Sequence, residues 1–300
     1  MKFKIACPHN TVTGGIELLH QVAAELNKYD GVTAELWYLA DRNVYKIPDD
    51  YSKYGNVVNN AIQDDDILIF PEIWARFAAD YGRNRRCIYW EGVDAYFAHN
   101  PNWFEFADVL HIYQSEYAHR FLIDTLKIEN VLEITDYVND DFLNCDISGK
   151  RDQIVLYNPV KGMEFTEKLI RLAKDLTFIP ITGMTRAQII GLMRRSMVWI
   201  EFGSFPGKDR LPREAGACGM CVVTGTHGSA RYHKDLAIPD EYKFPDTNNA
   251  DLGPIIEKIR TIMADFESHS KDFDGYRKRL KQEKQQFESG IRELVEHFEV

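Results

Sequence analysis

Residues 200–225, with the sequence IEFGSFPGKDRLPREAGACGMCVVTG, constrain the fold of this chain more than any other segment. The pattern predicts an apolar strand, a loop with glycine and cationic residues, a short helix that opens at Pro212, and a second apolar strand. Proline fits the first position of a helix because its missing N–H group would have no partner there in any case. This order of elements is typical of α/β proteins, in which ligands bind at the carboxyl ends of the strands.

Charged residues gather where this helix is predicted to begin. Lys208, Arg210 and Arg213 lie close in sequence to the helix N-terminus, whose N–H groups also attract negative charge. We therefore predict a binding site for an anion such as phosphate, with a solvated cationic loop as the alternative. Glu214 falls in the predicted first turn, and a carboxylate among cations fits a role in binding sugar or ribose hydroxyls.

Strand and helix patterns alternate along the whole chain. Strands are predicted near residues 3–7, 34–39, 67–70, 87–90, 109–113 and 131–134, and again near 154–157, 178–181, 197–202 and 221–224. Such alternation predicts parallel sheets covered by helices on both faces. The polar stretch 144–152 predicts a boundary between two domains. An apolar stripe over residues 276–298 predicts one long helix that packs on its own protein, with a membrane-surface helix as the alternative.

Composition limits the partners and the compartment. The net charge of −10 argues against a nucleic-acid partner, which requires a basic face to displace counterions. The five cysteines are irregularly spaced and do not predict a disulfide framework. The N-terminus reads as a first strand rather than a signal peptide, and no apolar run is long enough to span a membrane. We therefore expect a cytoplasmic protein, with peripheral association at the cytoplasmic face of a membrane left open.

The segment that begins at Glu214 resembles the donor-binding stretch of GT-B glycosyltransferases, particularly the retaining family 4 type. In that family a glutamate that opens a helix is followed by Ala-x-Ala-x-Gly and an apolar strand; this chain has EAGACG, then CVVTG, then Gly228-Ser229-Ala230. The resemblance implies the GT-B fold, with two Rossmann-like parallel-sheet domains that face an inter-domain cleft. Residues 1–147 would form the acceptor-side domain, 148–272 the nucleotide-sugar-binding domain, and 273–300 a helix that packs back across the domains.

Further motifs match the family pattern. Gly14 and Gly15 lie between the first strand and the first helix, where paired glycines let the backbone approach a ligand closely, although such turns also need glycine for geometry alone. The resemblance implies that they line the cleft beside the donor phosphates and the acceptor. It also implies that Lys161 neutralises the donor diphosphate and that Gly228 and Ser229 contact the donor.

Two features depart from the family pattern. An arginine expected near residues 157–158 is missing, and Pro206 occupies the place of the first of two family glutamates. We infer that Lys208 and Arg210 replace the missing positive charge. Asp209 and Glu201 are the candidate replacements for the missing carboxylate.

Two acidic residues, Glu91 and Asp94, follow the strand predicted at 87–90. In related enzymes this strand end often presents a histidine or an acid to the reacting sugar. The resemblance therefore makes both residues candidates for binding the acceptor or for removing its proton. An N-cap or a surface loop explains them equally well.

These observations predict a glycosyltransferase that moves a sugar from a nucleotide-sugar donor to a glycan or lipid-linked glycan acceptor. Fixed cations would stabilise the leaving diphosphate, so neither a cofactor nor a metal is expected. Retention of the anomeric configuration and a role in cell-surface polysaccharide biosynthesis follow from the resemblance. A GT-B-like epimerase or phosphorylase and a non-catalytic nucleotide-sugar-binding subunit are the alternatives.

Overall fold

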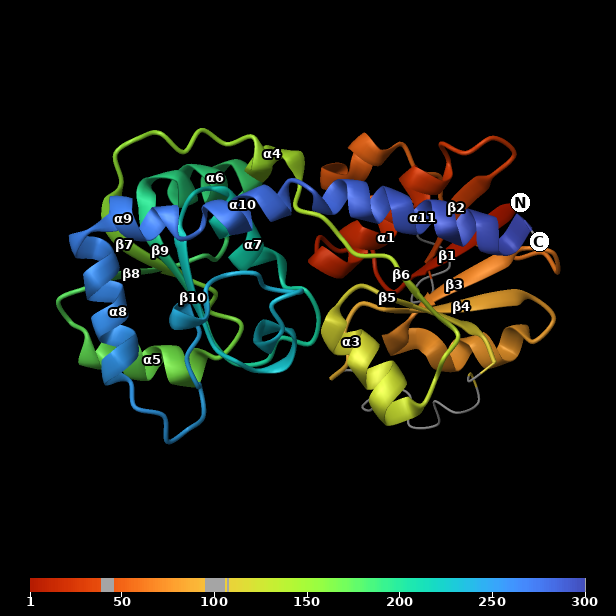
Figure 1. Cartoon of the computed structure of the whole chain (residues 1–300). Coiled ribbons are helices and arrows are strands. Elements are labelled where there is room, and N and C mark those ends of the chain that lie inside the picture. The colour runs from red at the N-terminus through yellow and green to blue at the C-terminus, as the bar shows by residue number, and fades with distance from the viewer. Residues whose placement is uncertain (39–45, 95–105, 107, 300) are drawn as a thin grey trace. The chain divides into compact units, whose positions relative to one another are not determined.

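The computed structural model describes residues 1–38, 46–94, 106 and 108–299. The chain divides into two compact units, each with its own parallel sheet (Figure 1). Unit 1 comprises Met1–Asp136 and Gln285–Val300, and unit 2 comprises Tyr137–Lys284. The predicted α/β class is confirmed, because every ladder within both sheets is parallel.

Unit 1 is built on a six-stranded sheet in the order β2-β1-β3-β4-β5-β6. Its strands are β1 (Lys2–Cys7), β2 (Thr33–Tyr38), β3 (Ile67–Pro71), β4 (Arg85–Trp90), β5 (Leu110–Tyr113) and β6 (Val131–Glu133). Within the described part of the chain, its helical segments are α1 (Gly14–Leu26), η1 (Asp49–Tyr54), η2 (Glu72–Tyr81), α3 (Glu116–Arg120) and η4 (Phe121–Leu126), together with most of α11 (Glu283–Glu299). Strand β3 is buried along its whole length and β4 is buried from Cys87 to Trp90, which is why these stretches are continuous apolar runs in the sequence.

Unit 2 is built on a four-stranded sheet in the order β10-β9-β7-β8. Its strands are β7 (Asp152–Tyr157), β8 (Thr177–Pro180), β9 (Ser196–Glu201) and β10 (Cys221–Thr224). Its helical segments are α4 (Asp140–Leu143), α5 (Met163–Leu172), α6 (Arg186–Arg195), α7 (Arg210–Ala217), η5 (Gly228–Arg231), η6 (Asp240–Tyr242), α8 (Gly253–Ala264), α9 (Phe266–Lys271) and α10 (Asp274–Leu280). The three-residue spacing of Thr185 and Gln188 in the sequence predicts a capping box, and this capping box is present at the start of α6.

The prediction of one continuous helix over 276–298 is wrong, because the helix is interrupted. The structure has two helices, α10 (Asp274–Leu280) and α11 (Glu283–Glu299), separated by Lys281 and Gln282. The apolar stripe continues across this break, so the periodicity alone did not reveal it. In α11 the buried side chains of Phe287, Ile291 and Leu294 extend the core of unit 1.

Helix α11, near the C-terminus, contacts strands β1, β4 and β6 of unit 1 directly. The ring of Phe298 packs edge-on against Phe3 of β1 with 5.9 Å between centroids, and the Phe298 carbonyl accepts a hydrogen bond from Arg85. Gly290 lies against the backbone of β6 at Glu133. No helix within the described residues is both long enough and apolar enough to cross a membrane.

Candidate functional site

The carboxyl ends of β7 and β9 form the switch point of the unit 2 sheet. From β7 the chain passes first to β8 on one side and later to β9 on the other side, so the loops after β7 and β9 diverge. Ligands of doubly wound sheets bind in the crevice at such a point. Asn158 and Lys161 follow β7, and Glu201 closes β9.

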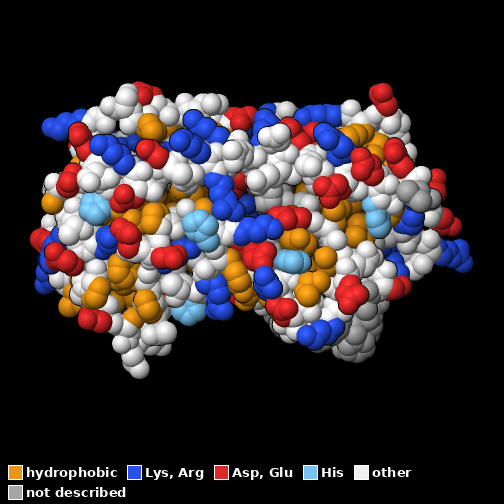
Figure 2. Space-filling model, viewed as in Figure 1, with side chains coloured by type: hydrophobic (Ala, Val, Ile, Leu, Met, Phe, Trp, Pro, Cys, Tyr) orange, Lys and Arg blue, Asp and Glu red, His pale blue; other side chains and the backbone are white. Residues whose placement is uncertain are grey.

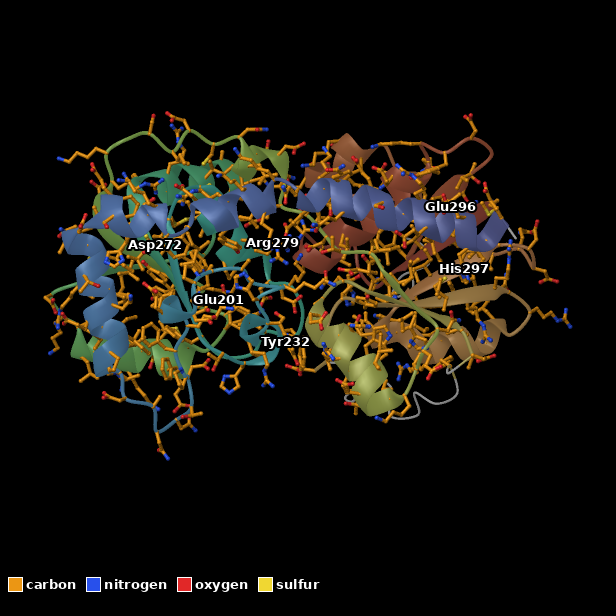
Figure 3. All side chains as sticks on the ribbon, in the orientation of Figure 1. Glu201, Tyr232, Asp272, Arg279, Glu296 and His297 are labelled. Carbon is orange, nitrogen blue, oxygen red and sulfur yellow. The ribbon has the colours of Figure 1, made fainter. Side chains whose placement is uncertain are left out.

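Glu201, labelled in Figure 3, has a buried carboxyl that accepts hydrogen bonds from two side chains. Asn158 Nδ2 lies 3.2 Å from its Oε1, and Trp199 Nε1 lies 3.2 Å from its Oε2. Burial raises the pKa of Glu201 to about 8, and the negative charge of Asp209 adds to the shift. Lys161 and the two donors oppose it. Burial at this position therefore favours the protonated form of the Glu201 carboxyl.

Lys161 already has a carboxylate partner in this structure. Its ammonium group forms an ion pair with Asp209 and lies 5.7 Å from the centre of the Phe205 ring. Asp209 directly precedes α7, so this pair joins the loop after β7 to the start of that helix. A bound phosphate would compete with Asp209 for the lysine.

Two glycines allow the loops after β7 and β9 to touch. Gly162 and Gly203 both have positive φ angles, of 56° and 93°. A Cβ at Gly203 would lie 2.9 Å from the Gly162 Cα, and a Cβ at Gly162 would clash with the Phe202 carbonyl. Larger residues would therefore push the Lys161 loop away from the end of β9.

Helix α7 begins at Arg210, two residues earlier than predicted, so Pro212 is its third residue and Glu214 its fifth. Glu214 therefore lies beyond the predicted first turn, and its side chain is buried. The earlier start is compatible with Pro212 because N–H groups of the first turn have no partner within a helix.

Lys208 and Arg213 share a carboxylate that the sequence argument did not consider. Lys208 Nζ lies 3.0 Å from Glu283 Oε1, and Arg213 Nη2 lies 2.6 Å from Glu283 Oε2. All three side chains are buried. The carboxylate of Glu283 therefore already supplies a negative charge beside these two cations, where the sequence predicted a bound anion. The roles of Lys208, Arg210 and Arg213 toward a donor stay predictions.

The loop after β10 is organised by a residue that sequence reasoning missed, Asp246. Its fully buried carboxylate accepts hydrogen bonds from the backbone N–H groups of Gly203 at 2.6 Å and Thr226 at 3.2 Å. The Nδ1 atom of the half-exposed His227 ring lies 2.5 Å from the same carboxylate. Asp246 therefore ties the loop after β9 to the loop after β10. No local pattern marks it, because its partners lie about 20 to 40 residues earlier in the chain.

Gly228 and Ser229, predicted to contact a donor, begin η5 in this loop. The Ser229 hydroxyl donates to the Gly207 carbonyl at 2.5 Å, and its backbone N–H donates to the Phe205 carbonyl at 2.9 Å. The Ser229 side chain is buried. In this structure it fastens η5 to the 205–207 loop, and its contact with a donor stays a prediction.

The switch point of unit 1 lies between β1 and β3, and a pocket opens there. Its volume is about 140 Å³. It is lined by the loops after β1, β3 and β4 and by the first turns of α1: Pro8, His9, Thr11, Thr13, Gly15, Ile16, Leu19, Pro71, Glu72, Ile73 and Glu91. Two of the predicted site residues, Gly15 and Glu91, thus meet in one pocket. Gly14 begins α1 beside them.

Glu91 is paired with a second acid, Glu72, which the sequence analysis did not single out. The backbone N–H of Glu91 donates to Glu72 Oε2 at 3.0 Å. Burial, and then the charge of Glu91, hold the pKa of Glu72 well above its usual range. Glu72 directly follows the buried strand β3, and an acid at that position was the signal that could have revealed it.

Gly15 allows the Glu91 carboxylate to approach the N-terminus of α1. A Cβ at position 15 would clash with Glu91 Oε2. Because helix N-termini favour negative charge, this protein carboxylate lies where an anionic ligand was predicted. Asp94 lies elsewhere: it is exposed and accepts a hydrogen bond from the Tyr117 hydroxyl at 2.9 Å. The structure therefore gives Glu91 and Asp94 different surroundings.

Among the described residues, no cluster of three or more His, Cys, Asp or Glu side chains is arranged to hold a metal ion.

Two Rossmann-like domains with all-parallel sheets define the fold as the GT-B type, and solved structures agree. No protein-family model matches the chain, and no curated protein matches its sequence. The chain is similar to sucrose-phosphate synthase from Thermosynechococcus elongatus, with 13% identity, 99% of this chain and 98% of that chain covered, and a TM-score of 0.64.

The chain is also similar to Anabaena HepE, solved in complex with UDP-glucose, with 12% identity, 99% and 100% coverage and a TM-score of 0.66. A further similar structure is UDP-GlcNAc 2-epimerase from Neisseria meningitidis, bound to UDP-GlcNAc, with 12% identity, 91% and 94% coverage and a TM-score of 0.56. At these identities the similarity concerns the fold.

Proposed function

We propose that this protein transfers a sugar from a nucleotide-sugar donor to a glycan or lipid-linked glycan acceptor. The observation that carries the proposal is the arrangement at the switch point of unit 2, where Lys161, Asp209 and Glu201 lie together. A lysine and a helix start at the carboxyl edge of a Rossmann-like sheet are suited to a diphosphate. Similar folds solved with UDP-glucose or UDP-GlcNAc support a nucleotide sugar as the ligand.

On the donor side, catalysis would be electrostatic. The diphosphate gains negative charge as the glycosidic bond breaks, and a positioned ammonium group stabilises that charge. Lys161 takes this role after it exchanges Asp209 for phosphate. Arg210 lies in the first turn of α7 and contributes further positive charge, and Glu214 binds sugar or ribose hydroxyls. This account needs no metal ion.

On the acceptor side, the pocket of unit 1 supplies the polar groups. Two neighbouring carboxyls in a buried site resist ionising together, so one retains its proton at neutral pH. We assign the proton to Glu72, which is the more buried, and the charge to Glu91. Glu91 would then bind an acceptor hydroxyl and take up its proton. Retention, a cytoplasmic location and a role in polysaccharide biosynthesis complete the proposal.

The first test measures nucleotide binding through the change that each nucleotide causes in the melting temperature. UDP, GDP, ADP, dTDP and CMP are added with and without magnesium to the wild type, Lys161→Ala and Lys174→Ala. We expect one nucleotide to stabilise the wild type by about 2–3 kcal/mol at a hundredfold excess over Kd. Lys174 is exposed and serves as the matched control, so only Lys161→Ala should lose the effect.

The result can contradict the proposal in two ways. Absence of a shift with every nucleotide would argue against a nucleotide-sugar enzyme and favour a degenerate GT-B fold. An effect that requires magnesium would contradict the metal-free account of the diphosphate site.

An epimerase is the second candidate, because the fold is similar to a UDP-GlcNAc 2-epimerase and because a carboxyl pair suits proton transfer at a sugar carbon. The two reactions differ in their requirement for an acceptor. An epimerase would convert a nucleotide sugar alone, and solvent deuterium would enter the sugar. A transferase would release nucleoside diphosphate only when an acceptor is supplied.

A further inference from the structure

The loop after β10 carries an imidazole ring that the proposed reaction does not use. The side chain of His227 in this loop is 48% exposed. Histidine side chains reach the surface over unit 2 in Figure 2, so exposure alone does not distinguish this residue. His227 is unusual because a buried carboxylate, that of Asp246, holds one of its two ring nitrogens.

The carboxylate of Asp246 is itself fixed in place. Its Oδ2 atom accepts a hydrogen bond from the Gly203 N–H, while its Oδ1 atom accepts one from the Thr226 N–H and lies 2.5 Å from His227 Nδ1. Gly225 makes room for this group, because a Cβ there would lie 2.1 Å from Asp246 Oδ2. A buried carboxylate needs such donors to offset its lost hydration. The ring is therefore tied to a rigid anchor.

The backbone on the other side of the ring is fixed as well. The Ser229 N–H donates a hydrogen bond to the Phe205 carbonyl at 2.9 Å. Gly228 has a φ of 54°, and a Cβ there would lie 2.0 Å from the same carbonyl oxygen, so this turn requires glycine. Because the residues on both sides of His227 are held, binding a ligand would cost this side chain little conformational entropy.

The same loop lies beside the groups assigned to the donor. The Gly225 N–H donates to the Glu201 carbonyl at 3.1 Å. Gly203 packs closely against Gly162, which follows Lys161 in the chain. Since the buried carboxylate binds the backbone of Gly203, it holds the imidazole next to the switch point that carries the lysine.

The contact with Asp246 decides which chemistry the ring offers to a ligand. An ionised carboxylate only accepts hydrogen bonds, so in the neutral ring the proton lies on Nδ1. The Nε2 atom then has a lone pair and fits a hydroxyl group that donates a hydrogen bond. Within the described residues, the structure shows no second partner for the ring of His227. A nucleotide sugar presents hydroxyl groups on its ribose and on its sugar.

We propose that His227 is a donor-binding residue whose Nε2 atom accepts a hydrogen bond from a hydroxyl group of the nucleotide sugar. Asp246 is a positioning residue, because it sets the orientation of the ring. This inference rests on the proposed function, since it assigns a further contact at the same donor site. The alternative is a histidine that only secures Asp246, and two substitutions separate these roles.

The variants are His227→Ala, which removes both ring nitrogens, and His227→Asn. The asparagine amide can replace Nδ1 as the donor to Asp246, but it has no atom at the position of Nε2. If the ring only secures Asp246, His227→Asn behaves as the wild type. If Nε2 binds the ligand, it behaves as His227→Ala. His233 is also an exposed residue of unit 2, so His233→Ala is the matched control.

The first measurement needs no nucleotide. Long-range proton–nitrogen correlation spectra of the full chain, with isotope-labelled histidine, show which ring nitrogen carries the proton. The signals that vanish in His227→Asn identify this ring. At pH 8 we expect its proton on Nδ1. A proton on Nε2 would overturn the proposal and leave the proposed function untouched.

The second measurement obtains dissociation constants from melting temperatures for three kinds of ligand. Pyrophosphate has no hydroxyl group, UDP, GDP, ADP and dTDP add the ribose, and the glucose ester of each adds a sugar. We expect a Kd for the hydroxyl-bearing ligand that is about three- to tenfold higher in His227→Ala and His227→Asn, the range for one lost hydrogen bond. A rise with the nucleoside diphosphates identifies a ribose hydroxyl, and a rise only with the esters identifies a sugar hydroxyl. The Kd of pyrophosphate should not change, and His233→Ala should match the wild type with every ligand.

The outcomes separate this proposal from the function on which it rests. Wild-type affinity in His227→Asn, or an equal loss of affinity for pyrophosphate, would overturn the role of Nε2 while the nucleotide site stands. Failure of every ligand to bind the wild type would instead overturn the proposed function, and this inference with it.

Discussion

Glu201 is buried at the end of β9, and burial raises the pKa of its carboxyl. The stability of the protein should therefore depend on pH through this residue. Its pKa is raised from 4.5 to about 8. The unfolded chain therefore releases this proton near pH 4.5, whereas the folded protein keeps it until about pH 8. The stabilising contribution is complete below pH 4.5 and is lost as the pH rises toward 8.

We predict that Glu201→Gln removes this dependence. The free energy of unfolding of the wild type should fall relative to that of the variant between pH 5 and pH 8, by roughly 2–4 kcal/mol. Urea titrations at several pH values measure the free energy of unfolding of both proteins. Contributions from titrating groups that the two proteins share cancel when one value is subtracted from the other. Parallel curves would show that Glu201 is ionised in the folded protein at neutral pH.

At the residue scale, the sequence predicts local partners and misses distant ones. Thr185 and Gln188 are three residues apart, and their capping box was predicted and is confirmed. Glu283 lies 70 residues or more from Lys208 and Arg213, and no spacing rule connects them. Asp246 is likewise far in sequence from the backbone groups that it binds. The largest differences between the predicted and the observed site therefore come from buried polar contacts between distant segments.

At the element scale, the start of α1 offers a direct test of the unit 1 pocket. In Gly15→Ala the new Cβ must displace the Glu91 carboxylate, which is the flexible end of its side chain. We predict that stability changes by less than about 1 kcal/mol, since alanine suits a helix better than glycine does. Transfer activity should fall about 10–100-fold, because a displaced carboxylate no longer meets the acceptor.

Gly82→Ala is the matched control for this variant. Gly82 has a φ of −59°, and a Cβ there would meet no atom within 4 Å. Its melting temperature and activity should match those of the wild type. Normal activity in Gly15→Ala would remove Glu91 from the proposed reaction.

Element boundaries were predicted where local chemistry sets them. The residues Ser115-Glu116-Tyr117 predict a helix cap at Ser115, and the Ser115 hydroxyl accepts a hydrogen bond from the Ala118 N–H. The apolar side chains at 117, 121, 122 and 126 predict one helix over 116–126, but after Arg120 the structure continues as the π-helical segment η4. The break between α10 and α11 was missed for a similar reason. In both cases the side-chain pattern continues while the backbone hydrogen bonding changes, and periodicity reports only the former.

At the scale of the whole molecule, the alternation of strands and helices was sufficient to predict two parallel sheets. Buried parallel strands are apolar on both faces, and such runs are visible in the sequence. The membership of Gln285–Val300 in unit 1 depends instead on contacts such as that between Phe298 and Phe3, which are almost the whole chain apart. Local sequence patterns cannot predict contacts between residues so far apart in the chain.

Each unit has its own core, so core mutations should act on one unit at a time. Leu294 of α11 is fully buried in unit 1, and Ile259 of α8 is fully buried in unit 2. Replacing either by alanine should cost about 2–5 kcal/mol, the range for truncating a buried aliphatic side chain. We predict that Leu294→Ala accelerates amide hydrogen exchange in β1, β3 and β4, whereas Ile259→Ala accelerates it in β7 and β9.

Nucleotide binding separates the two variants further. If the donor site lies on unit 2, the Leu294→Ala protein should retain the nucleotide-dependent protection of β7 and β9 at temperatures where unit 1 already exchanges. The matched Ile259→Ala protein should need more nucleotide for the same protection, because binding must also restore the weakened core. Exchange that spreads evenly over both sheets in either variant would show that the chain unfolds as one cooperative body, in spite of its two separate cores.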